Sequence, residues 1–325
     1  MSCNTIVAVD IGGTNARFAR AGLAPGEAPT LTGIRKYKVA DYPSLTDAWR
    51  RFAEDEGGSL PDRAAIALAA PTAHTPIKLT NSHWIVDPDE LADTLGLKRV
   101  MLVNDFEAIA HGATLLPSSH LHRVFGPEGG LPRKGVATVI GPGTGLGVAI
   151  VSMGADGAHI LPTEGGHMDF APVDEADDRM LDQLRQRFGR VSVERLVSGP
   201  GLNHIYQALA AMAGDEATPT DDATLWQAAL SGGNPRAAEA LDRLCMCYGA
   251  VAGDLALAHG AACVVLAGSL TQRMRQYSGF ARFHERFLLK GRYRDHMAEI
   301  LVLFADHPEL GLFGAAVAGA ALTGD

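Results

Sequence analysis

Short apolar runs alternate along this chain with longer stretches of helical periodicity. Residues 5–11 form a β-branched run that Gly12 and Gly13 interrupt, and residues 17–21 resume it, as in a β-hairpin. At 87–88, Asp-Pro is typical of a helix start. Similar patterns predict the other elements: strands over 31–39, 64–69, 99–104, 135–140, 146–152 and 263–267, and helices over 43–56, 88–95, from 105 onward, through most of 174–259 and over 309–322. The alternation predicts an α/β fold.

One of these hairpins occurs twice. When residue 7 is laid over residue 137, the segments 7–19 and 137–149 align, and both carry a Gly-Thr pair at the tip. Two such hairpins, far apart in sequence, indicate a duplicated fold whose two tips face one ligand. The coinciding residues are Val9 and Val139, Gly13 and Gly143, Thr14 and Thr144, and Ala19 and Ala149.

Composition and charge narrow the function. The chain has 325 residues, about twice a ~150-residue domain, so two domains are expected. A net charge of −9 gives no basic footprint for nucleic acid or anionic lipid, so a small anionic ligand must be held by local backbone groups or a metal. Four cysteines match neither a disulfide framework nor a zinc pattern. With no signal segment, and with the longest weakly polar run (255–270) shorter than ~18 residues, we expect a cytoplasmic protein without membrane spans.

The two glycine-rich turns are candidates for phosphate binding. In Asp10-Ile-Gly-Gly-Thr14, glycines allow close backbone approach to a phosphate, and Asp10 is a candidate to hold Mg²⁺ through water. The alternative for this segment alone is a plain hairpin turn. Gly141-Pro-Gly-Thr-Gly145 favours the phosphate interpretation by supplying a second turn of the same kind. Neither turn is a P-loop, which needs a lysine, or a dinucleotide fingerprint, which opens directly into a helix.

Asn104 and Asp105 form a polar pair at the end of a predicted strand, where ligands of α/β sheets commonly bind. Asp105 has two interpretations. It is either a general base or the N-cap of the following helix. Spacing alone favours the cap, and the two roles are compatible.

Glu164-Gly-Gly-His167 and Glu194 form a further polar set. Carboxylates accept hydrogen bonds from vicinal hydroxyls, so the set suits a hydroxyl-rich ligand such as a sugar. The alternative is half of a metal site, although a second helical Glu-x-x-His motif is missing from the sequence.

The segment 273–294 is basic and interleaved with aromatic residues. Phe280, Phe283 and Phe287 recur at one helical face, which favours an amphipathic helix with a solvated basic side over a nucleic-acid strip. Cys245 and Cys247 lie in an apolar helical stretch and are predicted to be core residues.

Taken together, these motifs resemble bacterial ATP-dependent glucokinase over essentially the whole chain and in the same order. Departures from the family pattern are few: Ser269 replaces a common second glycine, Thr163 replaces a glycine and Pro142 replaces a small residue. The motifs that carry the resemblance are Asp10-Ile-Gly-Gly-Thr-Asn-Ala-Arg17, Leu79-Thr-Asn81, Val103-Asn-Asp-Phe106, Gly141-Pro-Gly-Thr-Gly-Leu-Gly147, the segment 161–172 around Glu-Gly-Gly-His, Glu194-Arg-Leu-Val-Ser-Gly-Pro-Gly201 and Ala267-Gly-Ser269.

The resemblance implies a duplicated actin/hexokinase-like (ribonuclease H-like) two-domain α/β fold with a central cleft. It implies a small domain of residues 1–109 plus 308–325, a large domain of residues 110–307, and a homodimer. The implied reaction transfers the γ-phosphoryl of ATP to the 6-hydroxyl of D-glucose, the first step of glycolysis, with Mg²⁺ as the metal.

The resemblance also implies roles for the matching positions. Asp105 would be the catalytic base. The implied sugar contacts are Asn81, Asn104, Asp105, Glu164, His167 and Glu194; the implied ATP contacts are Asp10, Gly12, Gly13, Thr14, Asn15, Gly141, Gly143, Thr144, Gly145, Gly268 and Ser269.

Two other classes of function remain as alternatives. A non-catalytic sugar sensor on the same fold would lose the base or the phosphate turns, whereas both motifs are present here. An actin-like filament or chaperone ATPase would keep the turns but lack Glu164, His167 and Glu194.

Overall fold

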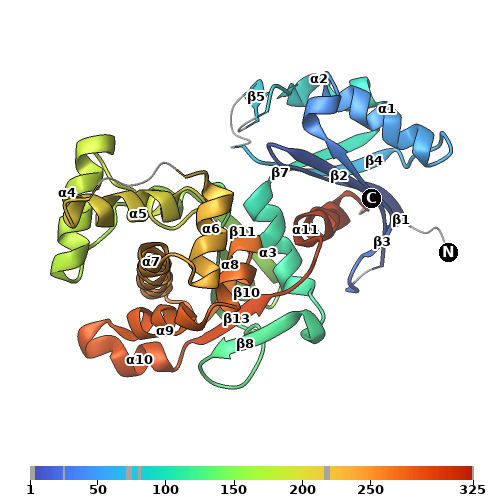
Figure 1. The fold of residues 1–325 in the computed structure, drawn as a ribbon. Coiled ribbons are helices and arrows are strands. Elements are labelled where there is room, and N and C mark those ends of the chain that lie inside the picture. Colours follow the sequence, from blue (N-terminus) through green and yellow to red (C-terminus); the bar gives the residue numbers. More distant parts are fainter. Residues whose placement is uncertain (1–3, 25, 71–74, 80–81, 216–219, 324–325) are drawn as a thin grey trace. The chain divides into compact units, whose positions relative to one another are not determined.

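The protein folds as two compact α/β units. In the computed structural model, residues 4–24, 26–70, 75–79, 82–215 and 220–323 are described (Figure 1). The first unit comprises residues 1–120 and 306–325, and the second comprises residues 121–305. None of the helices in the described ranges combines the length and the apolar character needed to cross a membrane.

A five-stranded sheet forms the centre of the first unit, in the order β3-β2-β1-β4-β7. The first three strands are antiparallel neighbours, whereas β4 and β7 run parallel to β1. A small separate hairpin pairs β5 with β6. The strands are β1 (Asn4–Ile11), β2 (Asn15–Leu23), β3 (Thr30–Lys38), β4 (Arg63–Leu68), β5 (Ile77–Lys78), β6 (Ile85–Val86) and β7 (Arg99–Asn104).

Both faces of the central strand β1 are buried, as its continuous apolar run predicts. Val7 and Val9 pack in one core cluster, together with residues of α1 (Leu45–Asp55) and α2 (Pro88–Leu95). Ile6 and Ala8 pack in a second cluster, together with residues of α3 (Asp105–Leu115) and α11 (Leu310–Ala318). Side chains alternate between the faces of a strand, so β1 contributes to both cores.

Helices α3 and α11 pack very closely. A side chain at Gly314 of α11 would overlap the carbonyl oxygen of Ala108 in α3, and one at Gly112 would lie about 3.0–3.2 Å from Leu310 and Gly314. The predicted C-terminal helix is therefore confirmed, and its glycines bring the two backbones together. After α11 the chain continues as a 3₁₀ helix over Gly319–Thr323.

The second unit repeats the same strand order, β11-β10-β9-β12-β13, with β8 added at the edge beside β13. Here too β9, β10 and β11 are antiparallel neighbours, and β12 and β13 run parallel to β9. This correspondence confirms the duplicated fold predicted from the repeated hairpin. The strands are β8 (Leu121–Phe125), β9 (Gly135–Pro142), β10 (Leu146–Gly154), β11 (Gly157–Thr163), β12 (Cys263–Leu266) and β13 (Leu301–Ala305).

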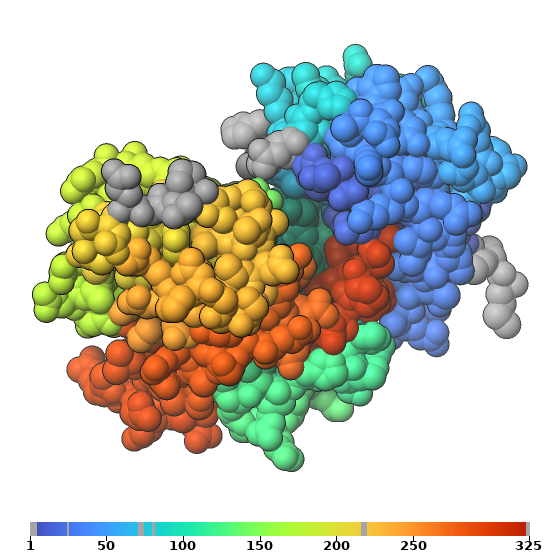
Figure 2. All heavy atoms as spheres, viewed as in Figure 1, coloured from blue at the N-terminus to red at the C-terminus, as the bar shows by residue number. Residues whose placement is uncertain are grey.

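Helices make up the rest of the second unit. In the space-filling view, segments coloured yellow-green to orange form most of this unit's visible surface (Figure 2). Cys245 and Cys247 of α7 are fully buried in the core, as predicted. The helices are α4 (Glu175–Phe188), α5 (Gly201–Met212), α6 (Asp222–Ser231), α7 (Pro235–His259), α8 (Ser269–Arg275), α9 (Ala281–Leu288) and α10 (Arg294–Ala298).

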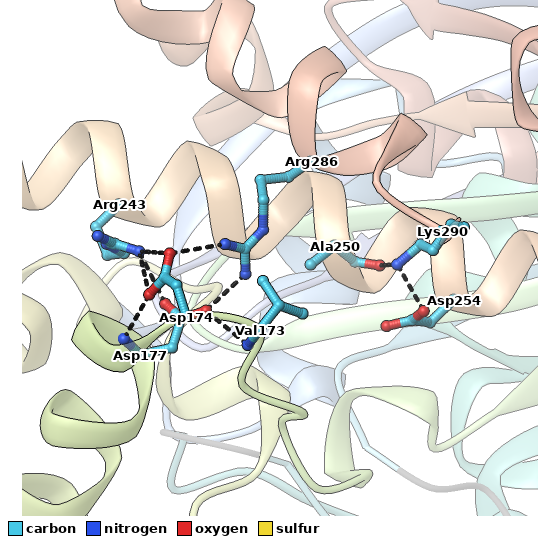
Figure 3. A network of polar contacts seen from close by, with 8 residues as sticks. All are labelled: Val173, Asp174, Asp177, Arg243, Ala250, Asp254, Arg286 and Lys290. Carbon is cyan, nitrogen blue, oxygen red and sulfur yellow. Dashed lines mark hydrogen bonds and ion pairs between the residues drawn. The ribbon is translucent and has the colours of Figure 1, made fainter. Parts of the chain in front are cut away.

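The prediction of an amphipathic helix from the spacing of Phe280, Phe283 and Phe287 is confirmed by α9, in which Phe283 and Phe287 are fully buried, but the prediction of a solvated basic side is wrong. The segment contains separate short helices, and Arg286 of α9 is only 3% exposed. Its guanidinium donates to Asp174 and to the fully buried Asp177, which also accept from Arg243 (Figure 3). A buried charge needs partners, and these carboxylates lie more than 100 positions away in sequence, so local periodicity could not reveal them.

Candidate active site

The first unit presents one half of the candidate residues around the turn between β1 and β2. The Gly12 N–H donates to the Asn15 carbonyl at 3.0 Å, and the Thr14 carbonyl accepts from Val39 N–H at 2.9 Å. The first bond closes the turn itself, and the second ties the turn to the residue that follows β3. Gly12 and Gly13 are half-buried and Thr14 is exposed, so the tip is open to a ligand.

Asp10, just before this turn, lies in a crowded polar cluster. Its carboxylate accepts from Arg17 Nη1 at 3.3 Å, and Arg17 Nε lies 2.9 Å from Glu309 Oε2 as an ion pair without hydrogen-bond geometry. Burial raises the pKa of Asp10; Arg17 opposes this effect and Glu309 adds to it. Gly311, in the first turn of α11, has no side chain, and a side chain there would collide with the Asp10 carboxylate.

Asn104, rather than Asp105, caps α3. Asn104 Oδ1 accepts from the N–H groups of Phe106 and Glu107 at 2.9 and 3.3 Å, and Glu107 Oε2 accepts in return from Asn104 N–H at 3.2 Å. This reciprocal arrangement is a capping box. The prediction that Asp105 is the N-cap is therefore wrong, because the residue before it takes that role.

Asp105 is instead the first residue of the helix, and its carboxylate is mostly buried. Its Oδ1 accepts from Phe106 N–H at 2.8 Å. Burial, and secondly the charge of Asp10, raise the pKa of Asp105 from 3.8 to about 6. Such a carboxylate is ionised at neutral pH yet holds a proton far better than an exposed aspartate, which is the behaviour expected of a general base.

The second unit presents the other glycine-rich turn, between β9 and β10. Gly143 N–H donates to the Gly145 carbonyl, and Gly143 in turn accepts from Gly199 N–H, both at 2.8 Å. Gly268 has a positive φ of 90°, and a side chain on it would lie 3.1 Å from the carbonyl of Pro142, at the end of β9. The fold therefore brings Gly268 and Ser269 beside the turn of residues 141–145.

The predicted sugar contacts of the second unit surround the start of β10. Gly165 and Gly166 pack against Val148 and Leu146, with no room for a side chain at Gly166. Glu164 and His167, at the two ends of this short turn, are 72% and 59% exposed, and their side chains approach to 3.9 Å. Among the described residues, His, Cys, Asp and Glu side chains form no group of three that suits a metal ion.

The structure thus sorts the candidates into two sets, one on each unit. Asn81 lies outside the described residues. The sequence analysis assigned no role to three residues that contact the candidates: Arg17 and Glu309 beside Asp10, and Gly199 beside Gly143. Arg17 and Gly199 lie within the motifs of the resemblance and could have been found there, whereas Glu309 has no local sequence signal. The first unit holds Asp10, Gly12, Gly13, Thr14, Asn15, Asn104 and Asp105; the second holds Gly141, Gly143, Thr144, Gly145, Glu164, His167, Glu194, Gly268 and Ser269.

Comparison with known proteins gives consistent similarities. A family model described as glucokinase matches residues 7–322. The glucokinase of Zymomonas mobilis is 46% identical over 313 residues, which cover 96% of this chain and 97% of that protein.

Comparison with solved structures also finds glucokinases. The crystal structure of a glucokinase from an Antarctic psychrotroph superposes with a TM-score of 0.86 at 32% identity and covers 98% of this chain and 99% of its own. A glucokinase from Balamuthia mandrillaris, solved in complex with glucose, has a TM-score of 0.80 at 20% identity, covering 98% of this chain and 94% of its own, and supports the fold.

Proposed function

The chain belongs to the glucokinase family and phosphorylates glucose, and on this premise we propose how its residues perform the reaction. The donor is ATP, and the acceptor is the 6-hydroxyl of glucose, so the products are glucose 6-phosphate and ADP. The observation that carries this proposal is the environment of Asp105, a mostly buried carboxylate with a pKa raised to about 6 at the start of α3.

Asp105 accepts the proton of the attacking hydroxyl. At pH 7 to 8 the carboxylate is ionised, so it is ready to take that proton as the oxygen bonds to phosphorus. Because Asn104 caps the helix, Asp105 is not needed for that structural role. Its carboxylate is held in place mainly by the Phe106 N–H.

The two Gly-Thr turns bind phosphate oxygens of ATP. Their backbone N–H groups supply fixed positive dipoles, and Thr14 and Thr144 add hydroxyl donors. Both threonines are exposed at their tips. Gly268 and Ser269 lie beside the second turn and are assigned to the nucleoside part.

Asp10 fits a magnesium ion held through water. Its carboxylate is largely buried and already paired with Arg17, so it would hold the ion through water rather than by direct coordination. When bound, Mg²⁺ neutralises charge on the phosphates. Arg17 donates a hydrogen bond to the Asp10 carboxylate, and the missing side chain of Gly311 leaves the space that this carboxylate occupies.

Glucose hydroxyls contact Asn81, Asn104, Glu164, His167 and Glu194. Carboxylates accept from vicinal hydroxyls, and amide and imidazole groups complete the pairing. The exposure of Glu164 and His167 leaves both side chains open to a sugar. As the family resemblance implies, we also propose that the enzyme is cytoplasmic and forms a homodimer. Light scattering on the purified protein tests the homodimer.

Release of ADP, measured with and without glucose, tests the assignment. We expect ADP formation that depends on glucose and yields glucose 6-phosphate. ATP hydrolysis at the same rate without glucose would favour an actin-like ATPase. Glucose binding without any turnover would favour a sugar sensor.

A further inference from the structure

Glu194 contacts the phosphate-binding turn of the second unit directly. It lies in the 3₁₀ helix Val193–Arg195, and its Oε2 accepts from the N–H of Leu146, the first residue after the turn, at 2.9 Å. Gly145 makes room for this carboxylate, because the three atoms nearest to a side chain at position 145 would all belong to the carboxyl group of Glu194.

Three segments meet at Leu146. Its N–H is bound by Glu194, and its carbonyl oxygen lies where a side chain at Gly166, in the sugar-binding turn, would be. The segment that follows Glu194 returns to the same place, because Gly199 N–H donates to the carbonyl of Gly143. The start of β10 is therefore held jointly by the residues assigned to the sugar and by those that follow them.

We infer that Glu194 is a positioning residue for the ATP-phosphate turn as well as a sugar contact, so that one carboxylate serves both substrates. This rests on the proposed roles of the turn and of Glu194. Oε2 is engaged by Leu146, whereas Oε1 accepts no hydrogen bond from the described residues and is open to a sugar hydroxyl. A displaced Glu194 would then change both sites together.

Binding of the non-hydrolysable ATP analogue AMPPNP with Mg²⁺, measured by calorimetry without glucose, separates the two roles. Glu194→Ala should raise the Kd of the analogue about 10-fold, since hydrogen bonds to charged groups are among the stronger ones. Glu194→Gln should bind the analogue within about 3-fold of wild type, because the amide oxygen can still accept from Leu146 N–H. Glu164→Ala is the matched control: it removes another proposed sugar contact, whose side chain approaches His167 rather than the phosphate turn.

Two glycine variants approach the same contact from the other side. Gly145→Ala should raise the Kd of glucose several-fold without nucleotide, because its methyl group displaces the Glu194 carboxylate. Gly143→Ala is its control in the same turn, since nothing lies within 4 Å of a side chain there, and it should leave the Kd of glucose unchanged. Neither glycine has a positive φ, so backbone strain does not enter the comparison.

The outcomes distinguish this inference from the proposed function. If Glu194→Ala weakens glucose binding but leaves the analogue unaffected, the positioning role is refuted and the sugar role stands. If it weakens only the analogue, the sugar role of Glu194 is refuted and the positioning role stands. If Glu194→Ala melts early, the glycine pair decides, and equal glucose affinity in both glycine variants overturns the inference.

Discussion

Replacing Asp105 with asparagine should make the enzyme more stable and much less active. The pKa of Asp105 rises from 3.8 to about 6 on folding, chiefly through burial. At ~1.36 kcal/mol per pKa unit, ionised Asp105 costs the folded state about 3 kcal/mol above pH 7. Asparagine carries no charge to bury, but it loses the favourable placement of an anion at a helix N-terminus, about 0.3–1 kcal/mol. We expect a net gain of about 2 kcal/mol.

The gain should depend on pH with a definite sign. Because burial favours the protonated form, the folded protein binds this proton more tightly than the unfolded chain between pH 3.8 and about 6. Over that range the contribution of Asp105 to stability falls as pH rises, and above it the contribution stays low. The variant and the wild type should therefore differ little below pH 4 and most at pH 8.

Catalysis should change in the opposite direction. Asparagine cannot accept the proton of the 6-hydroxyl, and loss of a general base typically costs ~10²- to 10⁴-fold in rate. In the wild type, kcat should fall as pH drops through about 6, when Asp105 becomes protonated. Urea unfolding at pH 4 and pH 8, together with kcat for glucose-dependent ADP formation, measures both effects.

Asn104→Ala is the control for helix capping. It should destabilise the protein by about 1 kcal/mol at both pH values, since the cap is neutral. An Asp105→Asn variant no more stable than wild type at pH 8 would show that the carboxylate is not desolvated. A variant that turns over within a few-fold of wild type would remove Asp105 as the base.

Three further substitutions, one of them with a control variant, test other parts of the structure. Thr144→Val should raise the KM for ATP while leaving glucose affinity by calorimetry near wild type, and equal loss of both would contradict the phosphate role of the second turn. Arg286→Met should lower the free energy of unfolding by about 3–5 kcal/mol, because it leaves buried Asp177 short of a partner, whereas Arg282→Met, at an exposed pair, should cost under about 1 kcal/mol. Gly314→Ala should lower the melting temperature markedly, because its methyl group would overlap the backbone of α3; an unchanged value would show that the helices separate at little cost.

Local signals in the sequence predicted the repeated hairpins and the helix after Asp87-Pro88, and the structure confirms both. Backbone conformation there is set by neighbours a few positions apart: glycines in the turns, and a cap followed by proline in α2. The cap at Asn104 was also readable, because Glu107 stands three positions later, as in a capping box. Choosing Asp105 for that role overlooked this signal.

What could not be predicted depends on partners distant in sequence. Arg286 of α9 is buried because Asp177 of α4 pairs with it. Likewise, Glu194 bonds to Leu146, which lies nearly 50 positions away in the sequence. The strands β5, β6, β8, β11 and β13 were also missed. For β13, the apolar run Leu301–Ala305 gave a strand-like signal, but β8 and β11 each present exposed positions that weaken the pattern.

The packing of α11 beneath the first sheet affects the order in which the protein can mature during translation. Ile6 and Ala8 leave the ribosome well before Leu312 and Ala316, which pack on the same face of the sheet. The second unit is contiguous in sequence and can complete its core while the chain is still being extended. The sheet of the first unit is therefore made before the second unit and completed after it, and the part of its apolar face that α11 covers is exposed to chaperones, or to aggregation, in the interval.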